Sequence, residues 1–187
     1  SFKTAASEAA AEKMSLSSGG NLTVSGDISA DNFKQEGTNF TGSLLVGHST
    51  TGTLDVASNN TGVGIYAMDA ITSGDSNTMV GAYSGTAITS GGNNTAFGNA
   101  SLYTSSTGAQ NTALGKDALK LTTGSYNTGI GYTAGTNITS GDGNVIIGDT
   151  DAGSATGDRQ LLIAGYDGST RTTWISGDSG GNLTFPG

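Results

Sequence analysis

The chain has 187 residues, a formal net charge of −8 and no cysteine, which excludes disulfide frameworks, thiolate metal sites and thiol nucleophiles. Its seven Lys and Arg residues are too few to hold a nucleic-acid backbone. No apolar run approaches the roughly 18 residues of a membrane span, so the sequence predicts neither nucleic-acid binding nor membrane insertion.

Residues 1–18 are predicted to form a short N-terminal helix, because alanine dominates them. Phe2, Ala6, Ala9 and Leu16 fall near the spacing of three and four residues that a coiled-coil seam requires. The end of a coiled coil and an isolated terminal helix both stay open for this segment.

Residues 19–58 are predicted to be short strands that cap the region after them. Leu22, Val24 and Ile28 alternate with polar residues around a glycine, as in a half-buried strand. Residues 43–58 look like a degenerate first turn of the repeat that follows.

Residues 59–149 carry a repeated signature, Asn-Thr-x-apolar-Gly, at spacings of 17, 17, 17, 16 and 17 residues. It begins at Asn60, Asn77, Asn94, Asn111 and Asn127 and returns in degenerate form at Asn144. A period that short indicates one supersecondary unit stacked on itself. The sequence therefore predicts an all-β fold, a parallel β-solenoid (β-roll or β-helix) with turns of 16–17 residues and flanking β modules.

Each column of the repeat has a physical interpretation. We expect Phe97 to lie in a buried apolar ladder between Val80 and Leu114 of the neighbouring turns. The repeated glycines indicate corners with positive φ, or places where backbones approach closely. The repeated asparagine suits a corner with left-handed geometry, and its side chain can bond an identical asparagine one turn away.

The second half of each turn is less regular. Ile71, Ile88 and Ile138 are predicted to form a second apolar ladder, whereas the middle turn has Ser105 there. The 16-residue turn lacks one residue just before Gly124, which predicts a corner at that point, since deletions in solenoids fall on loops.

The predicted core is thin. Two large apolar residues per turn are few against an ordering cost of about 1.5 kcal/mol per residue. We therefore expect other copies of the chain to supply burial around an axis parallel to the stack, which predicts a homo-oligomer. Residues 150–187 leave the period and are predicted to form a separate C-terminal β module.

Three modules together resemble a known family. The Asn-Thr-Ala-Leu-Gly units are similar to repeats of bacteriophage tail fibres and, more distantly, to the β-roll head of YadA-like trimeric adhesins. Gly20–Ala30 looks like a common fibre strand module, and Asp158–Gly165 with Thr173–Asp178 resembles the segment that precedes a fibre's C-terminal chaperone. The resemblance covers roughly residues 20–187 and implies an elongated homotrimeric virion protein.

No catalytic constellation is visible, so we expect no enzymatic activity and no cofactor. His48 is the only histidine and lies beside a glycine without a recognisable motif. Carboxylates fall in different columns of the repeat, at Asp69, Asp75, Asp117, Asp142, Asp149 and Asp151. Neither an RTX nonapeptide nor a 12-residue EF-hand loop is present, so no metal site is expected within a chain. An ion on an oligomer axis stays open.

The candidate binding residues are five tyrosines, Tyr66, Tyr83, Tyr103, Tyr126 and Tyr132. Exposed aromatic rings on a fibre can stack against sugars. The five fall in several columns, which predicts scattered positions instead of one stripe. The alternative interpretation is that they cover apolar surface at corners and between chains.

We therefore interpret the chain as a structural shaft segment of a trimeric phage tail fibre or spike, located in the virion tail and supporting host attachment. The expected partners are two further copies, other virion tail proteins and host cell-surface polysaccharide. One alternative is the head of a trimeric bacterial surface adhesin, which is expected to need a C-terminal membrane anchor that this sequence lacks. Another is an ice-binding solenoid, because threonines recur at Thr61, Thr78, Thr95, Thr112 and Thr128, although the column beside them is mixed.

Overall fold

The computed structural model describes residues 14–16, 18, 22–24, 40–46 and 55–186. The chain divides into two compact units, Ser1–Phe33 and Lys34–Gly187. His48 lies outside the described residues. No described helix is long and apolar enough to cross a membrane.

The first unit contains a hairpin in place of the predicted helix. Strand β1 (Met14–Leu16) pairs antiparallel with β2 (Leu22–Val24). The helix prediction is therefore wrong at residues 14–16, and the part before them lies outside the described residues. The physical reason is the Gly19-Gly20 pair that follows, because a Gly-Gly sequence between two short segments ends a helix and favours a hairpin turn.

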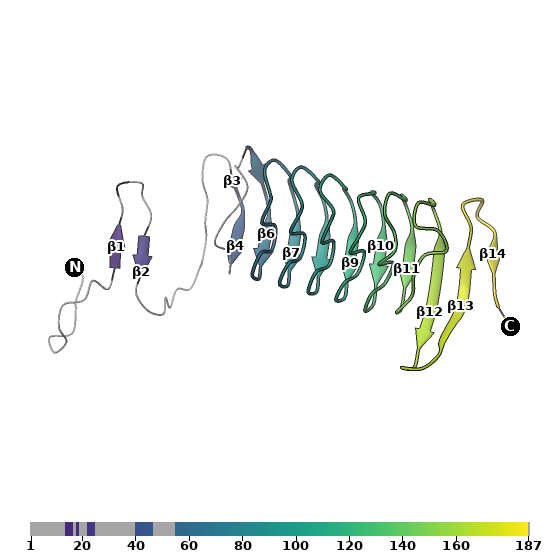
Figure 1. The fold of residues 1–187 in the computed structure, drawn as a ribbon. Coiled ribbons are helices and arrows are strands. Elements are labelled where there is room, and N and C mark those ends of the chain that lie inside the picture. The colour runs from purple at the N-terminus through teal and green to yellow at the C-terminus, as the bar shows by residue number, and fades with distance from the viewer. Residues whose placement is uncertain (1–13, 17, 19–21, 25–39, 47–54, 187) are drawn as a thin grey trace. The chain divides into compact units, whose positions relative to one another are not determined.

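The second unit is a parallel β-solenoid, as predicted (Figure 1). Each turn contributes one short strand to a ten-stranded sheet, and neighbouring turns pair in parallel and in register. The parallel strands are β4 (Leu44–Val46), β6 (Thr61–Val63), β7 (Thr78–Val80), β8 (Thr95–Phe97), β9 (Thr112–Leu114), β10 (Thr128–Ile130), β11 (Val145–Ile147) and β12 (Leu161–Tyr166). All the described regular elements are strands.

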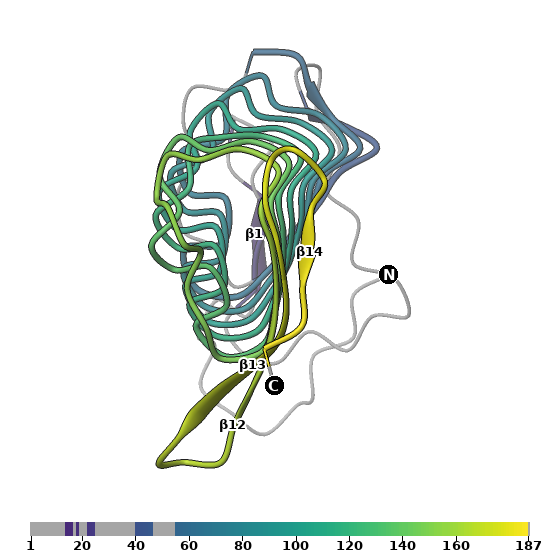
Figure 2. The same ribbon diagram turned by 90° about the vertical axis from the view of Figure 1, so that its right-hand side faces the viewer.

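Three further pairings complete this unit. Strand β3 (Phe40–Thr41) pairs in parallel with β5 (Ala57–Ser58) in a small separate sheet. Strand β13 (Arg171–Gly177) returns antiparallel along β12, and β14 (Leu183–Thr184) follows it. Viewed along the stack, the turns superpose and the β12–β13 hairpin projects beyond their outline (Figure 2).

The stack extends past the repeated signature at both ends. At one end, β4 pairs with β6, so that Leu44 lies beside Thr61. At the other, β12 pairs with β11, and Gln160 replaces the repeated asparagine. The backbone N–H and the side chain of Gln160 both donate to Asn144 Oδ1, at 2.9 and 3.1 Å. A longer amide therefore continues the ladder where the signature is lost.

A ladder of asparagines runs through the interior of the solenoid. Asn94 is fully buried, and its backbone N–H and Nδ2 both donate to Asn77 Oδ1 at 3.0 Å. Its Nδ2 also donates to the Gly108 carbonyl at 2.9 Å, and its Oδ1 accepts from Asn111. The predicted bonding between identical asparagines is confirmed, and each side chain satisfies groups in two neighbouring turns.

The predicted left-handed geometry falls on a different residue. Positive φ is found at the residue before each ladder asparagine, at Asn59, Ser76, Asn93, Gln110 and Tyr126. The ladder asparagines themselves point into the core. Their side-chain amides there bond backbone N–H and carbonyl groups, for example the Gly108 carbonyl. The preceding, exposed residue therefore turns the corner.

The repeated glycines have both of the predicted roles. Gly98 has a φ of +141°, and a Cβ there would collide with the Gly115 carbonyl of the next turn. A Cβ on Gly91 would collide with the Gly108 carbonyl in the same way. Side chains at these columns would push neighbouring turns apart, so glycine is required at the stacking distance of about 4.8 Å.

The interior is narrow. Where one column of the repeat holds a large residue, another column of the same turn holds a small one. One turn fills it with Met79 and Ile88, which leaves room only for Gly85, because a Cβ there would approach Met79 Sδ at 2.8 Å. The next turn has Leu102 with Ser105 instead. Such large-small exchange keeps the packed volume nearly constant from turn to turn.

The second apolar ladder is confirmed, although the described segments that carry it form no strand. Ile71, Ile88 and Ile138 are fully buried. The segment around them consists of bends and turns, which stack through backbone hydrogen bonds such as Thr72 N–H to the Thr89 carbonyl at 3.0 Å. The chain also bends at Gly124, where the shortened turn predicts a corner.

We predict that Asn94→Asp destabilises the solenoid strongly at neutral pH. The new carboxylate would replace the Nδ2 donor with an acceptor that faces Asn77 Oδ1 and the Gly108 carbonyl, which we expect to cost about 3 kcal/mol or more. Burial should raise the pKa of this carboxyl above its unfolded value, so the loss should be largest at neutral pH and shrink as pH falls toward 3.

Thermal unfolding followed by circular dichroism at pH 7 and pH 3 measures this effect. The matched control is Asn93→Asp, since Asn93 is exposed and next in sequence. Equal melting temperatures of the two variants at pH 7 would contradict the role of the asparagine ladder.

Candidate functional surfaces

An apolar ladder covers the outer face of the parallel sheet. It consists of the last residue of each three-residue strand and its counterpart in β12, namely Val46, Val63, Val80, Phe97, Leu114, Ile130, Ile147 and Ile163. The side chains are partly exposed; Phe97 is 46% and Val63 is 38% exposed. The paired strands place these residues side by side over a length of about 34 Å at the usual strand spacing.

The prediction that Phe97 lies in a buried ladder is therefore wrong. The middle residue of each strand points inward instead, as Ala96 and Met79 do, and both are fully buried. The reason is space, because the narrow interior admits one side chain from each strand, and its size ranges from Ala113 to Met79 between turns. Strand alternation then directs both flanking residues outward.

The threonine rank lies on the same outer face, beside the apolar ladder. The threonines open strands β6 to β10 and are partly buried. Along the parallel strands β4 and β6 to β11, the outward positions carry no charged residue. This face is thus uncharged on a chain with a net charge of −8.

Three of the five candidate tyrosines lie together on a corner of the solenoid. The rings of Tyr66 and Tyr83 stack with centroids 5.1 Å apart, and the Tyr103 ring lies 6.4 Å from Tyr83. Tyr103 comes from a different column, and the corner brings it next to Tyr83. Each ring remains more than a third exposed.

The other two candidates are separate from this cluster. Tyr132 is exposed, and Lys116 Nζ lies 5.4 Å from its ring centroid. Tyr126 occupies the positive-φ corner before the asparagine ladder. The predicted scatter of the five tyrosines thus applies to these two only.

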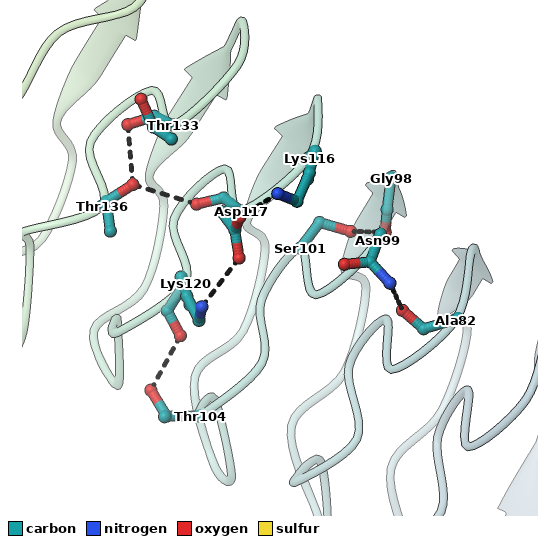
Figure 3. Close-up of polar contacts among 10 residues, drawn as sticks. All are labelled: Ala82, Gly98, Asn99, Ser101, Thr104, Lys116, Asp117, Lys120, Thr133 and Thr136. Carbon is teal, nitrogen blue, oxygen red and sulfur yellow. Dashed lines mark hydrogen bonds and ion pairs between the residues drawn. The ribbon is translucent and has the colours of Figure 1, made fainter.

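An ionic cluster of Lys116, Asp117 and Lys120 lies on a corner of the solenoid (Figure 3). Backbone hydrogen bonds between turns place Asp117 in the same column as Tyr83. Lys120 Nζ lies 2.8 Å from Asp117 Oδ1, and Lys116 Nζ lies 3.4 Å from Asp117 Oδ2. Partial burial acts to raise the pKa of Asp117, but hydrogen bonds and charge from Lys120 and Lys116 outweigh it and hold the pKa below its ordinary value. Thr136 donates to the Asp117 carbonyl at 3.1 Å, which ties the cluster to the following turn.

The carboxylates do not form a metal site among the described residues, where no group of three potential ligands gathers. Asp75 and Asp142 instead accept backbone N–H groups from Ser58 and Ser125 in the preceding turns, at 2.7 and 2.6 Å. Asp149 pairs with Arg171 of strand β13 at 3.2 Å. These side chains hold neighbouring segments together.

The structure adds a site that the sequence interpretation misses. Trp174 on β13 is 57% exposed and borders an open hollow at the β12–β13 hairpin. The sequence places Trp174 only within the predicted C-terminal β module. A single tryptophan in a polar, threonine-rich strand was the available signal, but its exposure depends on how the hairpin is bulged.

Comparison with known proteins identifies no relative: no protein family, curated protein or solved structure matches the chain.

We predict that Lys120→Met raises the pKa of Asp117 and makes stability less dependent on pH. The depressed pKa stabilises the fold above the unfolded value of about 3.9, and this contribution is lost as pH falls through the folded pKa. Because Lys120 is partly exposed, we expect at most about 1 kcal/mol. NMR titration of the carboxyl carbon measures the shift, with Arg159→Gln, which removes an exposed cation outside the cluster, as a control. An unchanged Asp117 titration would contradict the assignment.

Proposed function

We propose that this chain is a shaft segment of a homotrimeric phage tail fibre or spike, which carries a host-recognition region and holds it away from the particle. The observation that carries the proposal is the outward apolar ladder. An eight-residue row of partly exposed Val, Leu, Ile and Phe side chains is costly to leave in water and typical of a surface that other chains cover.

Copies of the same chain are the occupants that fit this face best. A rotation axis parallel to the stack keeps every turn level with its counterparts, so each ladder residue meets the same residue of its neighbours. The largest, Phe97, would then pack against other copies of itself. The sequence resemblance to tail fibres supports three copies.

Charge supports the same arrangement. Three chains with a net charge of −8 repel one another unless the surfaces in contact are neutral. The apolar ladder and the threonine rank meet this condition. Exposed acidic residues such as Asp75, Asp142 and Asp158 lie at corners outside this face and would keep the assembly soluble.

A shaft of this kind acts mechanically. Each turn is joined to the next by strand pairing, the asparagine ladder and corner hydrogen bonds, so bending it would break several bonds at once. Three copies in each fibre, and several fibres on a particle, would raise avidity without strong single contacts. Other virion tail proteins would join the shaft at its ends, and host surface polysaccharide would be the target.

The two alternatives predict different measurements. An adhesin head would share the trimeric solenoid and differ in location, on a bacterial surface. An ice-binding solenoid needs two parallel threonine ranks on a flat face, whereas here one threonine rank lies beside an apolar ladder. The absence of thermal hysteresis would agree with the shaft, and its presence would favour ice binding.

We predict a solution mass near three times 18.4 kDa, about 55 kDa, and loss of the trimer in Phe97→Asp. A carboxylate at this position would be buried beside its own copies, where like charges repel and desolvation is costly. The control is Tyr126→Asp, which changes a side chain 61% exposed at another corner. Size-exclusion chromatography with light scattering measures the mass. A folded monomer or dimer of the unmodified chain at micromolar concentration would overturn the proposal.

A further inference from the structure

A bulge in strand β13 places Trp174 where a regular strand would not. In the pairing of β12 with β13, Ile163 lies opposite Ile175, and the next pair is Ala164 with Thr173. Trp174 therefore has no partner across the strands. Bulges are known to redirect side chains near functional sites.

The indole of Trp174 lies directly on Gly165 of the facing strand. A Cβ on Gly165 would be 2.5 Å from Cζ2 and 2.6 Å from Cη2 of the indole, so only glycine leaves room for the ring. One side of the ring thus rests on backbone. Since Trp174 is 57% exposed, much of the remaining ring is open to solvent.

Polar groups with unused hydrogen-bonding capacity surround this ring. The hollow has a volume of about 290 Å³ and is lined by Gly165, Tyr166, Asp167, Thr170, Thr172 and Trp174. Its size is at the lower end of small-molecule sites, which span about 300–1,000 Å³. Neither threonine hydroxyl makes a hydrogen bond within the described part of the chain.

The carboxylate of Asp167 is held in place and ionised. Its Oδ1 accepts from the backbone N–H groups of Thr170 and Ser169, at 2.7 and 2.8 Å. These hydrogen bonds lower the pKa of Asp167. Its Oδ2 accepts no hydrogen bond from the described residues and remains available to a ligand.

The hairpin loop is also anchored. Arg171 pairs with Asp149 of the preceding turn, and its guanidinium lies 5.7 Å from the centroid of the Tyr166 ring. These contacts fix the loop that carries Asp167 relative to the strand that carries Trp174. They also engage Arg171, the one cation beside the hollow among the described residues, so an anionic ligand would meet the Asp167 carboxylate without a compensating charge.

We propose that this hollow binds one neutral hexose unit of a polysaccharide. The electron-rich face of an indole attracts the C–H groups of a pyranose face. A carboxylate and two hydroxyls suit the ring's hydroxyl groups, which both donate and accept. The hollow is open, so a sugar chain can continue beyond it. Its biological role rests on the proposed attachment function, whereas the binding itself needs only this hairpin.

Trp174 is the only tryptophan of the chain, so fluorescence excited at 295 nm reports on this hollow alone. The full chain is screened on an array of neutral hexose and N-acetylhexosamine glycans, and the retained glycan is titrated as a soluble hexasaccharide. We expect a saturable change in emission, with a dissociation constant near the millimolar range that a ligand of this size supports.

Variants separate the sugar site from a structural role of the hairpin. Asp167→Asn keeps the loop, because asparagine makes the same turn, and should weaken binding about tenfold. Gly165→Val displaces the indole and should abolish the emission change. Trp174→Ala should abolish retention on the array. Phe185→Ala changes an exposed aromatic residue that does not line the hollow, and this variant should bind as the unmodified chain does.

Three outcomes would overturn the proposal. The first is that the array retains the chain on no glycan. The second is that a glycan binds without changing the tryptophan emission and binds the Asp167→Asn variant as tightly as the unmodified chain. The third is that the indole is shielded from acrylamide quenching in the absence of sugar. The last would mean that another copy of the chain covers Trp174. Solution mass is measured separately, so failure of the trimer and failure of the sugar site are distinguishable.

Discussion

Parallel, in-register stacking of turns about 4.8 Å apart is the constraint on which this structure depends. Many backbone and side-chain polar groups inside the solenoid find their partners in the turn above or below. The buried asparagines do so, since Asn94 bonds both Asn77 and Asn111 and also caps the Gly108 carbonyl. Glycines at two columns then allow the backbones to approach that closely.

The same spacing makes the interior narrow, and this decides where the apolar residues lie. The space is filled by exchange between columns, for example Met79 beside Gly85 in one turn and Ala96 beside Leu102 in the next. Each three-residue strand turns only its middle residue inward, so the residue at its end lies on the opposite face. Phe97 and its counterparts are consequently displayed on the outer face, where they form an apolar ladder instead of a core.

The outer surface is thereby divided into regions with different chemistry. The sheet face is apolar and uncharged and suits contact between copies of the chain. The corner with Tyr83 and Asp117 is aromatic and ionic, and its lysines are paired with a carboxylate. The β12–β13 hairpin projects from the last turn and holds Trp174 and Asp167 beside an open hollow. Assembly and recognition can therefore use separate parts of one chain.

The sequence by itself determined the stacking, because its period predicts a parallel solenoid. The columns of the repeat also predict the positions that need glycine, the asparagine ladder and the second apolar ladder, which contains Ile71 and Ile88. It could not determine which side of a three-residue strand faces inward, because Thr95 and Phe97 share one face and only the packed volume selects it. Nor could it place Tyr103 beside Tyr83, or Trp174 over Gly165, since a corner and a bulge create those contacts. Periodicity decides which residues stack, whereas packing in three dimensions decides which of them are buried.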